Sequence, residues 1–158
     1  MSINTGREGH TYAPAEPYQV SRDAIREFAA AVKAAHPAHH DLQAAQSLGH
    51  RDLVAPPTFA VTVAQRAEAA VVNDPEAGID FSRVVHAEER FTHHGPITAA
   101  DTLTAQATLD RIRVMGAGAM LTTVTEITAE DGSARATVTS SLLVRAEEAA
   151  DDDAEEGQ

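Results

Sequence analysis

Histidines are the residues of this chain whose type and spacing could most directly do chemistry. His36, His39 and His40 are spaced as i, i+3 and i+4, which on a helix can bring imidazoles to one metal ion. Pro37 interrupts that spacing and no further ligand lies close in the sequence, so we expect no metal site. A single imidazole can instead act as a general base together with a carboxylate from elsewhere in the fold. His39 is the candidate for this role, and the alternative is a surface histidine without one.

A second group of histidines lies in a segment that alternates like a β-strand. Adjacent strand residues face opposite sides, so His93 and His94 cannot easily bind one ion. His86 and Glu88 should share a face, where they could line a pocket between subunits or simply pair with Arg90. Because the chain has no cysteine, thiolate metal sites, cysteine nucleophiles and disulfides are excluded.

The composition describes one acidic domain with a charged end. The chain has 158 residues, 43% of them apolar, and 24 acidic against 12 basic residues give a net charge of −12. Such a surface repels phosphate, so we expect neither nucleic acid nor an anionic membrane as a partner. Seven acidic residues lie in 146–158, which we predict to be a disordered tail. We find no secretory signal and no membrane-spanning run, so we expect a cytoplasmic protein.

The N-terminal half should supply loops and short helices. Residues 1–17 are predicted to be loop, because glycines and prolines interrupt regular structure. Tyr18–Val20 can form a short strand, and Ser21 is a favourable N-cap for a helix. A second short helix is expected over Leu42–Leu48. The first helix should bury the apolar stripe Ile25, Phe28, Ala29 and Val32.

A longer apolar helix is predicted after Pro56 and Pro57, with Thr58 as its N-cap. This helix should be largely buried, because one wide face is apolar. The residues of that face are Phe59, Ala60, Val63, Ala64, Ala67, Ala70 and Val71. Since several of them are alanines, a sheet could approach the helix closely.

After residue 80 the apolar residues recur at every second position, which predicts long strands. The expected strands are Val84–His94, Thr102–Arg113, Met120–Thr128 and Ala134–Arg145. Asp131 and Gly132, between the last two, form a typical hairpin turn. Helices followed by strands with one apolar face predict an α+β fold, in which an antiparallel sheet packs on the buried helix.

Three stretches of the sequence carry a resemblance to a known family. They read YQVSRDAIREFAAAV, QSLGHRDLVAPPTF and SRVVHAEERFTHHGPITAADTL. Their order and spacing resemble the MaoC-like dehydratases and hydratases, and more specifically the non-catalytic A-type subunits of the actinobacterial heterodimeric (3R)-hydroxyacyl-acyl-carrier-protein (ACP) dehydratases. The resemblance covers about residues 9–145. It implies a hot-dog fold, an antiparallel sheet wrapped around a central helix, in a single domain over residues 18–145.

The resemblance also implies that the chain lacks part of the family's catalytic machinery. The active segment of the family reads roughly G-D-x-N-P-x-H, and its aspartate and histidine fall on Ala34 and His39 here. The His-Gly pair whose backbone N–H groups bind the thioester carbonyl falls on Pro56 and Pro57. Alanine has no proton to exchange and proline has no N–H, so both the acid–base pair and the carbonyl site are incomplete.

In the family, the start of the central helix encloses the acyl chain. The substrate-binding residues that this implies are Thr58, Phe59, Val61, Thr62, Gln65 and His86, although Phe59 and Val61 could simply be core. The segment Gly95–Asp101 is similar to the family's P-x-x-A-G-D motif, with Ala100 in place of glycine. We expect Asp101 to cap a turn near the pocket.

The function implied is that of a substrate-holding subunit of a (3R)-hydroxyacyl-thioester dehydratase in fatty acid elongation. A catalytic B-type MaoC-like partner would supply the acid and base, the substrate would be acyl-ACP or acyl-CoA, and no cofactor or metal is expected. One alternative is a non-enzymatic acyl-thioester-binding homodimer. Another is a hot-dog thioesterase or hydratase whose acids have moved to Glu88 or Asp101. A single hot-dog sheet leaves edge strands and an apolar rim to be covered, which favours pairing in every case.

Overall fold

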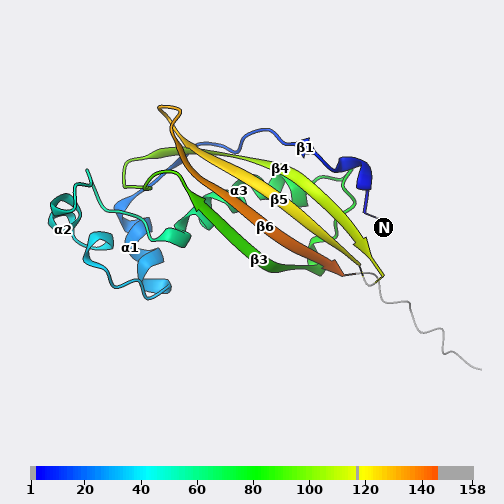
Figure 1. Cartoon of the computed structure of the whole chain (residues 1–158), viewed down its shortest axis with the longest axis horizontal. Helices are drawn as coiled ribbons and strands as arrows, with labels where there is room; N and C mark the ends of the chain where they lie inside the picture. Colours follow the sequence, from blue (N-terminus) through cyan, green and yellow to red (C-terminus); the bar gives the residue numbers. More distant parts are fainter. Residues whose placement is uncertain (1–2, 117, 146–158) are drawn as a thin grey trace, which may run out of the picture.

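The computed structural model describes residues 3–116 and 118–145, and the predicted acidic tail lies outside them. One six-stranded antiparallel sheet wraps around a long helix, α3, which lies behind the sheet in Figure 1. The order along the sheet is β1-β4-β5-β6-β3, and β2 also pairs with β4. The predicted α+β hot-dog architecture is therefore confirmed.

The long strands agree with the alternating pattern, with small shifts at their ends. They are β3 (Val84–His93), β4 (Thr102–Met115), β5 (Gly118–Ala129) and β6 (Ala134–Arg145). Every second residue of β4, β5 and β6 is buried over most of their length, which gives the sheet one face toward α3. Asp131 and Gly132 turn the chain from β5 to β6 as predicted, and Gly132 adopts φ +81°, which glycine reaches without steric cost.

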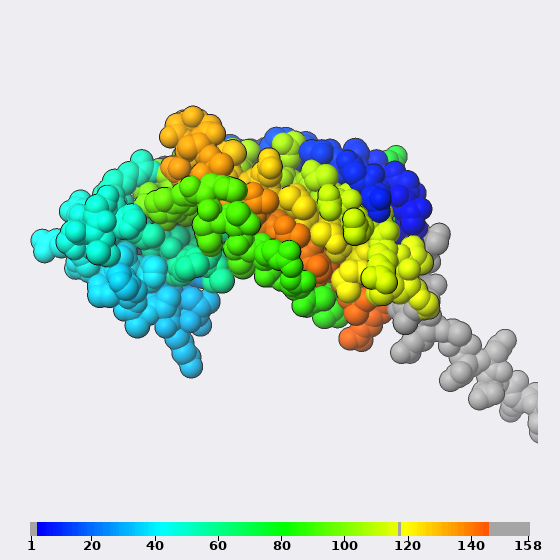
Figure 2. All heavy atoms as spheres, viewed as in Figure 1, coloured from blue at the N-terminus to red at the C-terminus, as the bar shows by residue number. Residues whose placement is uncertain are grey.

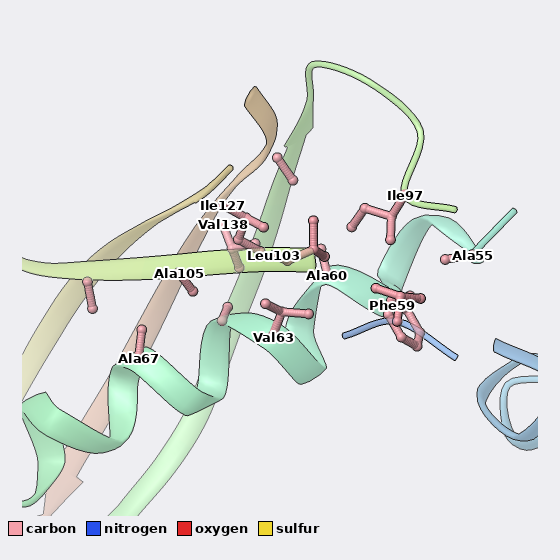
Figure 3. Close-up of a cluster of buried hydrophobic side chains, with 14 of the residues drawn as sticks. Ala55, Phe59, Ala60, Val63, Ala67, Ile97, Leu103, Ala105, Ile127 and Val138 are labelled. Atoms are coloured by element: carbon pink, nitrogen blue, oxygen red, sulfur yellow. The ribbon is translucent and has the colours of Figure 1, made fainter. Parts of the chain in front are cut away.

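The central helix α3 (Ala60–Val72) is introduced by the 3-10 turn η3 (Pro57–Phe59). Its apolar face packs on the inner face of the sheet, where Ala60, Val63 and Ala67 point toward side chains of three strands (Figure 3). Two expectations are wrong. Thr58 makes no capping hydrogen bond, because the 3-10 turn takes the chain into the helix. Ala70 is exposed, and the buried place on that face belongs to Glu68.

Two short helices, α1 (Arg22–Ala31) and α2 (Leu42–Ser47), lie at the end of the sheet where α3 begins (Figure 1). The predicted N-cap is confirmed, since the Ser21 hydroxyl accepts a hydrogen bond from the Ala24 N–H at 3.0 Å. Ile25 and Ala29 are fully buried and Phe28 is half-buried, as the stripe predicts. Val32 is an exception, 47% exposed, because the helix has already ended and Val32 is its C-cap.

The N-terminal segment is more regular than the predicted loop. It contains the 3-10 turn η1 (Thr5–Arg7) and the two-residue strand β1 (His10–Thr11), and β2 (Tyr18–Gln19) follows. Both short strands pair with β4, because the edge of that strand offers backbone groups that need partners. The longest helix of the described chain, α3, has 13 residues, and no helix there is long and apolar enough to cross a membrane.

Candidate functional site

The entrance to α3 is where the family resemblance places catalytic groups. The 3-10 turn η2 (Pro37–His39) brings His39 beside the segment that leads to the helix, with its Nδ1 2.6 Å from the carbonyl oxygen of Val54. A carbonyl can only accept, so Nδ1 carries the proton in this contact and Nε2 of the neutral ring is an acceptor. His39 thus has the tautomer that a general base requires.

Among the residues that the structure describes, no acid bonds to His39 at this entrance. Ala34 stands where an aspartate would be expected, and within residues 3–116 and 118–145 no carboxylate forms a hydrogen bond or ion pair with His39. The neighbouring imidazoles contact the backbone separately: His36 Nδ1 accepts from the Ala38 N–H at 3.2 Å, and His40 Nε2 lies 2.9 Å from the Ala34 carbonyl oxygen. In the described chain, no three such residues are placed to hold a metal ion.

Proline removes an amide donor at the same entrance. Pro57 opens the turn η3 and has no N–H of its own, so the first backbone N–H of the turn is that of Thr58; the next, that of Phe59, donates to the Pro56 carbonyl at 2.9 Å. A cavity of about 370 Å³ adjoins both prolines and is also lined by His93 and His94. A thioester carbonyl placed against the Pro57 nitrogen would lack the amide donor of the glycine that the family resemblance expects at this position.

A second cavity, of about 410 Å³, lies between α3 and strands β3 and β6. Its apolar wall consists of Ala69, Val72, Phe81, Val84 and Leu142. The predicted residues Gln65 and His86 both line it, together with Glu68. The structure therefore brings two of the predicted substrate-binding residues to one cavity, which we name the α3–β3 cavity.

A buried carboxylate forms part of the wall of the α3–β3 cavity. Glu68 has 5% of its side chain exposed, and its Oε1 accepts hydrogen bonds from Thr123 Oγ1 at 2.7 Å and from Ser140 Oγ. Its Oε2 lies 3.9 Å from His86 Nε2 and makes no hydrogen bond to any residue that the structure describes. One oxygen of Glu68 is thus anchored and the other is open.

Glu89 on β3 extends this arrangement into a cluster of five residues, Glu68, His86, Glu89, Thr123 and Ser140, which we call the carboxylate cluster. Glu89 Oε1 lies 3.0 Å from the same Ser140 hydroxyl. Burial raises the pKa of Glu89, and the nearby charge of Glu68 adds to this effect. Because Ser140 has only one proton to donate, both of its contacts are hydrogen bonds only when one carboxyl group is protonated.

A β-bulge explains why the alternation along β3 does not reveal the cluster. The register of β3 against β6 shifts between His86 and Glu88. His86 and Glu89 therefore both approach Glu68, whereas Glu88 is exposed and accepts a hydrogen bond from Arg90 at 2.9 Å. The predicted pairing of Glu88 with Arg90 is confirmed, and the predicted shared face of His86 and Glu88 is wrong. The sequence feature that could have revealed Glu68 is its position among the buried residues of α3.

The other predicted substrate-binding residues lie at the start of α3. Thr58 is exposed, and Phe59 is 1% exposed in the core, with its ring centroid 5.4 Å from that of Phe28. Val61 and Thr62 are half-buried, and the Thr62 hydroxyl donates to the Phe59 carbonyl at 2.8 Å. None of these four predicted residues lines the α3–β3 cavity.

Asp101 holds a turn, as predicted, and is not a free acid. Its carboxylate is buried and accepts a hydrogen bond from the Thr98 N–H at 2.9 Å. It also forms ion pairs with Arg51 and, at 3.4 Å, with Arg135. Ala100 in this turn adopts φ +70°, the left-handed region that favours the glycine expected there. Both relocated acids considered from the sequence, Glu88 and Asp101, are thus engaged by arginines.

Comparison with known proteins identifies the family. Residues 7–138 match the family model described as "FAS1-like, dehydratase domain region". The chain belongs to the FAS1-like dehydratase family. Among its relatives, a UPF0336 protein of Leifsonia xyli subsp. xyli is 44% identical over 148 residues, covering 94% of this chain and 99% of that protein. A UPF0336 protein of Streptomyces coelicolor is 40% identical over 150 residues, covering 95% and 100%.

Solved structures of the family share this architecture. A chain of the C-terminally truncated HadBC (3R-hydroxyacyl-ACP dehydratase) complex from Mycobacterium tuberculosis is 29% identical, with a TM-score of 0.79 over 87% of this chain and 96% of that one. A MaoC-like dehydratase is 32% identical with a TM-score of 0.80, and the match covers 88% of this chain and 42% of that longer one. This chain is therefore a FAS1-like dehydratase domain of the MaoC-like hot-dog type.

Proposed function

We propose that this FAS1-like dehydratase domain is the non-catalytic, A-type subunit of a heterodimeric (3R)-hydroxyacyl-thioester dehydratase of fatty acid elongation. The helix entrance carries the proposal. His39 is present there with its tautomer fixed, but Ala34 replaces the aspartate and Pro57 offers no N–H. A B-type MaoC-like partner supplies the missing groups, and this chain helps to hold the acyl group of an acyl-ACP or acyl-CoA substrate.

The chemistry of dehydration explains why these two losses matter. A base removes the proton next to the thioester carbonyl, an acid protonates the departing hydroxyl, and a donor stabilises the negative charge that develops on the carbonyl oxygen. His39 alone could perform one proton transfer at most. Because no carboxylate of the described residues bonds to His39 and Pro57 has no amide hydrogen, we assign the remaining steps to residues of another subunit.

The free edge of the sheet supports pairing with a second subunit. Among the described residues, β3 stands at the end of the sheet order and pairs with β6 alone, so the backbone groups that point away from β6 along Val84–His93 have no strand partner. Val85 on this strand is 42% exposed, and β3 lies at the molecular surface in Figure 2. The α3–β3 cavity lies beside the same edge, so a subunit covering β3 would help to enclose a bound acyl chain.

The test is an activity measurement on purified chains. The chain is assayed for hydration of crotonyl-CoA, followed by loss of the ultraviolet absorbance of the conjugated thioester. It is assayed alone and after co-expression with MaoC-like proteins, encoded in the same genome, that contain the motif D-x-N-P-x-H. We expect no turnover by this chain alone and turnover by a co-purified complex.

The control is the same complex with the motif aspartate of the partner replaced by asparagine, which should be inactive. Turnover by the isolated chain would refute the non-catalytic role. A stable homodimer that binds acyl-CoA but pairs with no MaoC-like protein would refute the partner and favour the binding-protein alternative.

A further inference from the structure

The open oxygen of Glu68 sets a chemical requirement on whatever occupies the α3–β3 cavity. Glu68 Oε1 accepts hydrogen bonds from Thr123 and Ser140, which only an acceptor at that oxygen can satisfy. The Glu68 side chain is 5% exposed and lines the cavity. Its Oε2 atom accepts no hydrogen bond from any described residue. His86 Nε2, at 3.9 Å, is too far away to donate one.

A plain alkyl chain fits this wall poorly. An alkyl chain in contact with Oε2 would displace solvent from this oxygen without donating a hydrogen bond to it. Leaving a buried acceptor without a hydrogen bond costs about 1–3 kcal/mol, and more when the acceptor is charged. An ammonium group would satisfy the oxygen but would lose its own hydration beside Val72, Phe81 and Leu142. A hydroxyl group on an otherwise apolar chain satisfies both the oxygen and the wall.

We infer that the α3–β3 cavity selects a hydroxylated acyl group, whose hydroxyl donates a hydrogen bond to Glu68 Oε2. Glu68 is then a specificity-determining residue that distinguishes a hydroxyacyl chain from the saturated or oxo chain of equal length. This inference rests on the proposed acyl-binding function. A keto oxygen has no proton to donate and would face the carboxylate with its lone pairs, so the oxo chain is the most strongly disfavoured.

The carboxylate cluster anchors one oxygen of Glu68 and leaves the other facing the cavity. Ser140 Oγ lies within hydrogen-bonding distance of Glu68 Oε1 and, at 3.0 Å, of Glu89 Oε1. Thr123 directs a proton to the same Glu68 oxygen. Because both hydroxyls bind Oε1, Oε2 remains available to accept a hydrogen bond from a ligand hydroxyl.

The experiment measures binding of matched acyl-CoA ligands by calorimetric titration. The ligands are decanoyl-CoA and its 3-hydroxy, 3-oxo, 9-hydroxy and 9-oxo derivatives, so that both the group and its position along the chain are varied. They are titrated into the purified full chain and into its complex with the catalytic partner. For one of the two positions, we expect the hydroxy ligand to bind at least about tenfold more tightly than decanoyl-CoA and than the oxo ligand, as is typical of a site built to bind a hydroxyl.

The variant E68Q tests the residue itself. Its amide keeps an acceptor for Ser140 and Thr123 but turns an N–H donor toward the cavity, so the preference for hydroxy over oxo should fall to about threefold or less. The matched control is E126Q, which removes an exposed carboxylate from β5 and should keep the wild-type preference. A hydroxy-to-oxo preference that is unchanged in E68Q would overturn the role of Glu68.

The two proposals fail in different ways. If all five ligands bind the wild-type chain or complex with similar affinity, acyl binding stands and the selection for a hydroxyl is refuted. If none of them binds either sample, the substrate-holding function is refuted and the selectivity inference falls with it.

Discussion

Replacing Asp101 by alanine should destabilise the fold by about 3–5 kcal/mol, the range for removing one partner of a buried ion pair. The Asp101 side chain is 2% exposed and faces Arg135, which is 18% exposed and would be left without its carboxylate. The buried N–H of Thr98 would also lose its acceptor, which alone is worth about 1–3 kcal/mol. Arg51 adds little, because its side chain is 60% exposed and solvent can replace the ion pair.

Urea unfolding followed by circular dichroism measures this change. The variant D101N should lose less than D101A, because its amide oxygen can still accept the hydrogen bond from Thr98. The control D110A removes an exposed aspartate from β4 and should alter the free energy of unfolding by less than about 0.5 kcal/mol. A loss of less than about 1 kcal/mol in D101A would refute the view that this carboxylate holds the turn at Ile97–Asp101.

Three further changes test other parts of the structure. Folded Glu89, with its raised pKa, keeps a proton that the unfolded chain releases near the ordinary value of 4.5, so wild-type stability should fall as pH rises from about 4.5 through the raised pKa. E89Q should lack that fall, as thermal melts across this range would show. Phe59→Ala should lose about 3–5 kcal/mol in urea unfolding, because Phe59 is 1% exposed and its ring would leave a cavity. Gly132→Ala should lose about 1 kcal/mol, since φ is +81° but no atom lies within 4 Å of the added carbon.

For each of these three predictions, one experimental outcome would contradict the reasoning. Parallel stability curves for E89Q and wild type would mean that Glu89 titrates alike in the folded and unfolded chains. A Phe59→Ala variant that loses less than about 1.5 kcal/mol would place that ring outside the core. An unchanged unfolding free energy in Gly132→Ala would show that the hairpin adopts another turn. The exposed residue Gln46 of α2 provides a neutral control as Gln46→Ala.

Local patterns predicted the elements well where neighbours in the sequence decide the outcome. The Ser21 cap, the buried residues Ile25 and Ala29, and the turn at Gly132 were all predictable, because each depends on a hydrogen bond, a helical spacing or a backbone angle within a few residues. Val32 was predicted to be buried but is exposed, because α1 ends before it. The exact residue at which a helix ends depends on fraying and capping, and the spacing of apolar residues does not determine it.

The candidate site was less predictable than the elements. His39 was proposed from its resemblance to the family pattern, and Gln65 and His86, predicted to bind substrate, both line the α3–β3 cavity. Glu68 and Glu89 were missed, Glu68 because a charged residue in an apolar helix face is ordinarily expected to be exposed. Glu89 was missed because one bulged residue reverses the alternation for the rest of β3.

The amino-acid sequence alone determined that neither the side chain of Ala34 nor the ring nitrogen of Pro57 can donate a proton, because a methyl group and a proline nitrogen have none to give in any conformation. It also determined the fold class, since the apolar periods of helix and strand are local properties. Only the tertiary structure decided that Glu68, Glu89 and Ser140 meet, because the sheet brings together residues up to 72 positions apart in the chain. Burial then does what no sequence pattern encodes: it raises the pKa of Glu89 and leaves one oxygen of Glu68 open to the cavity.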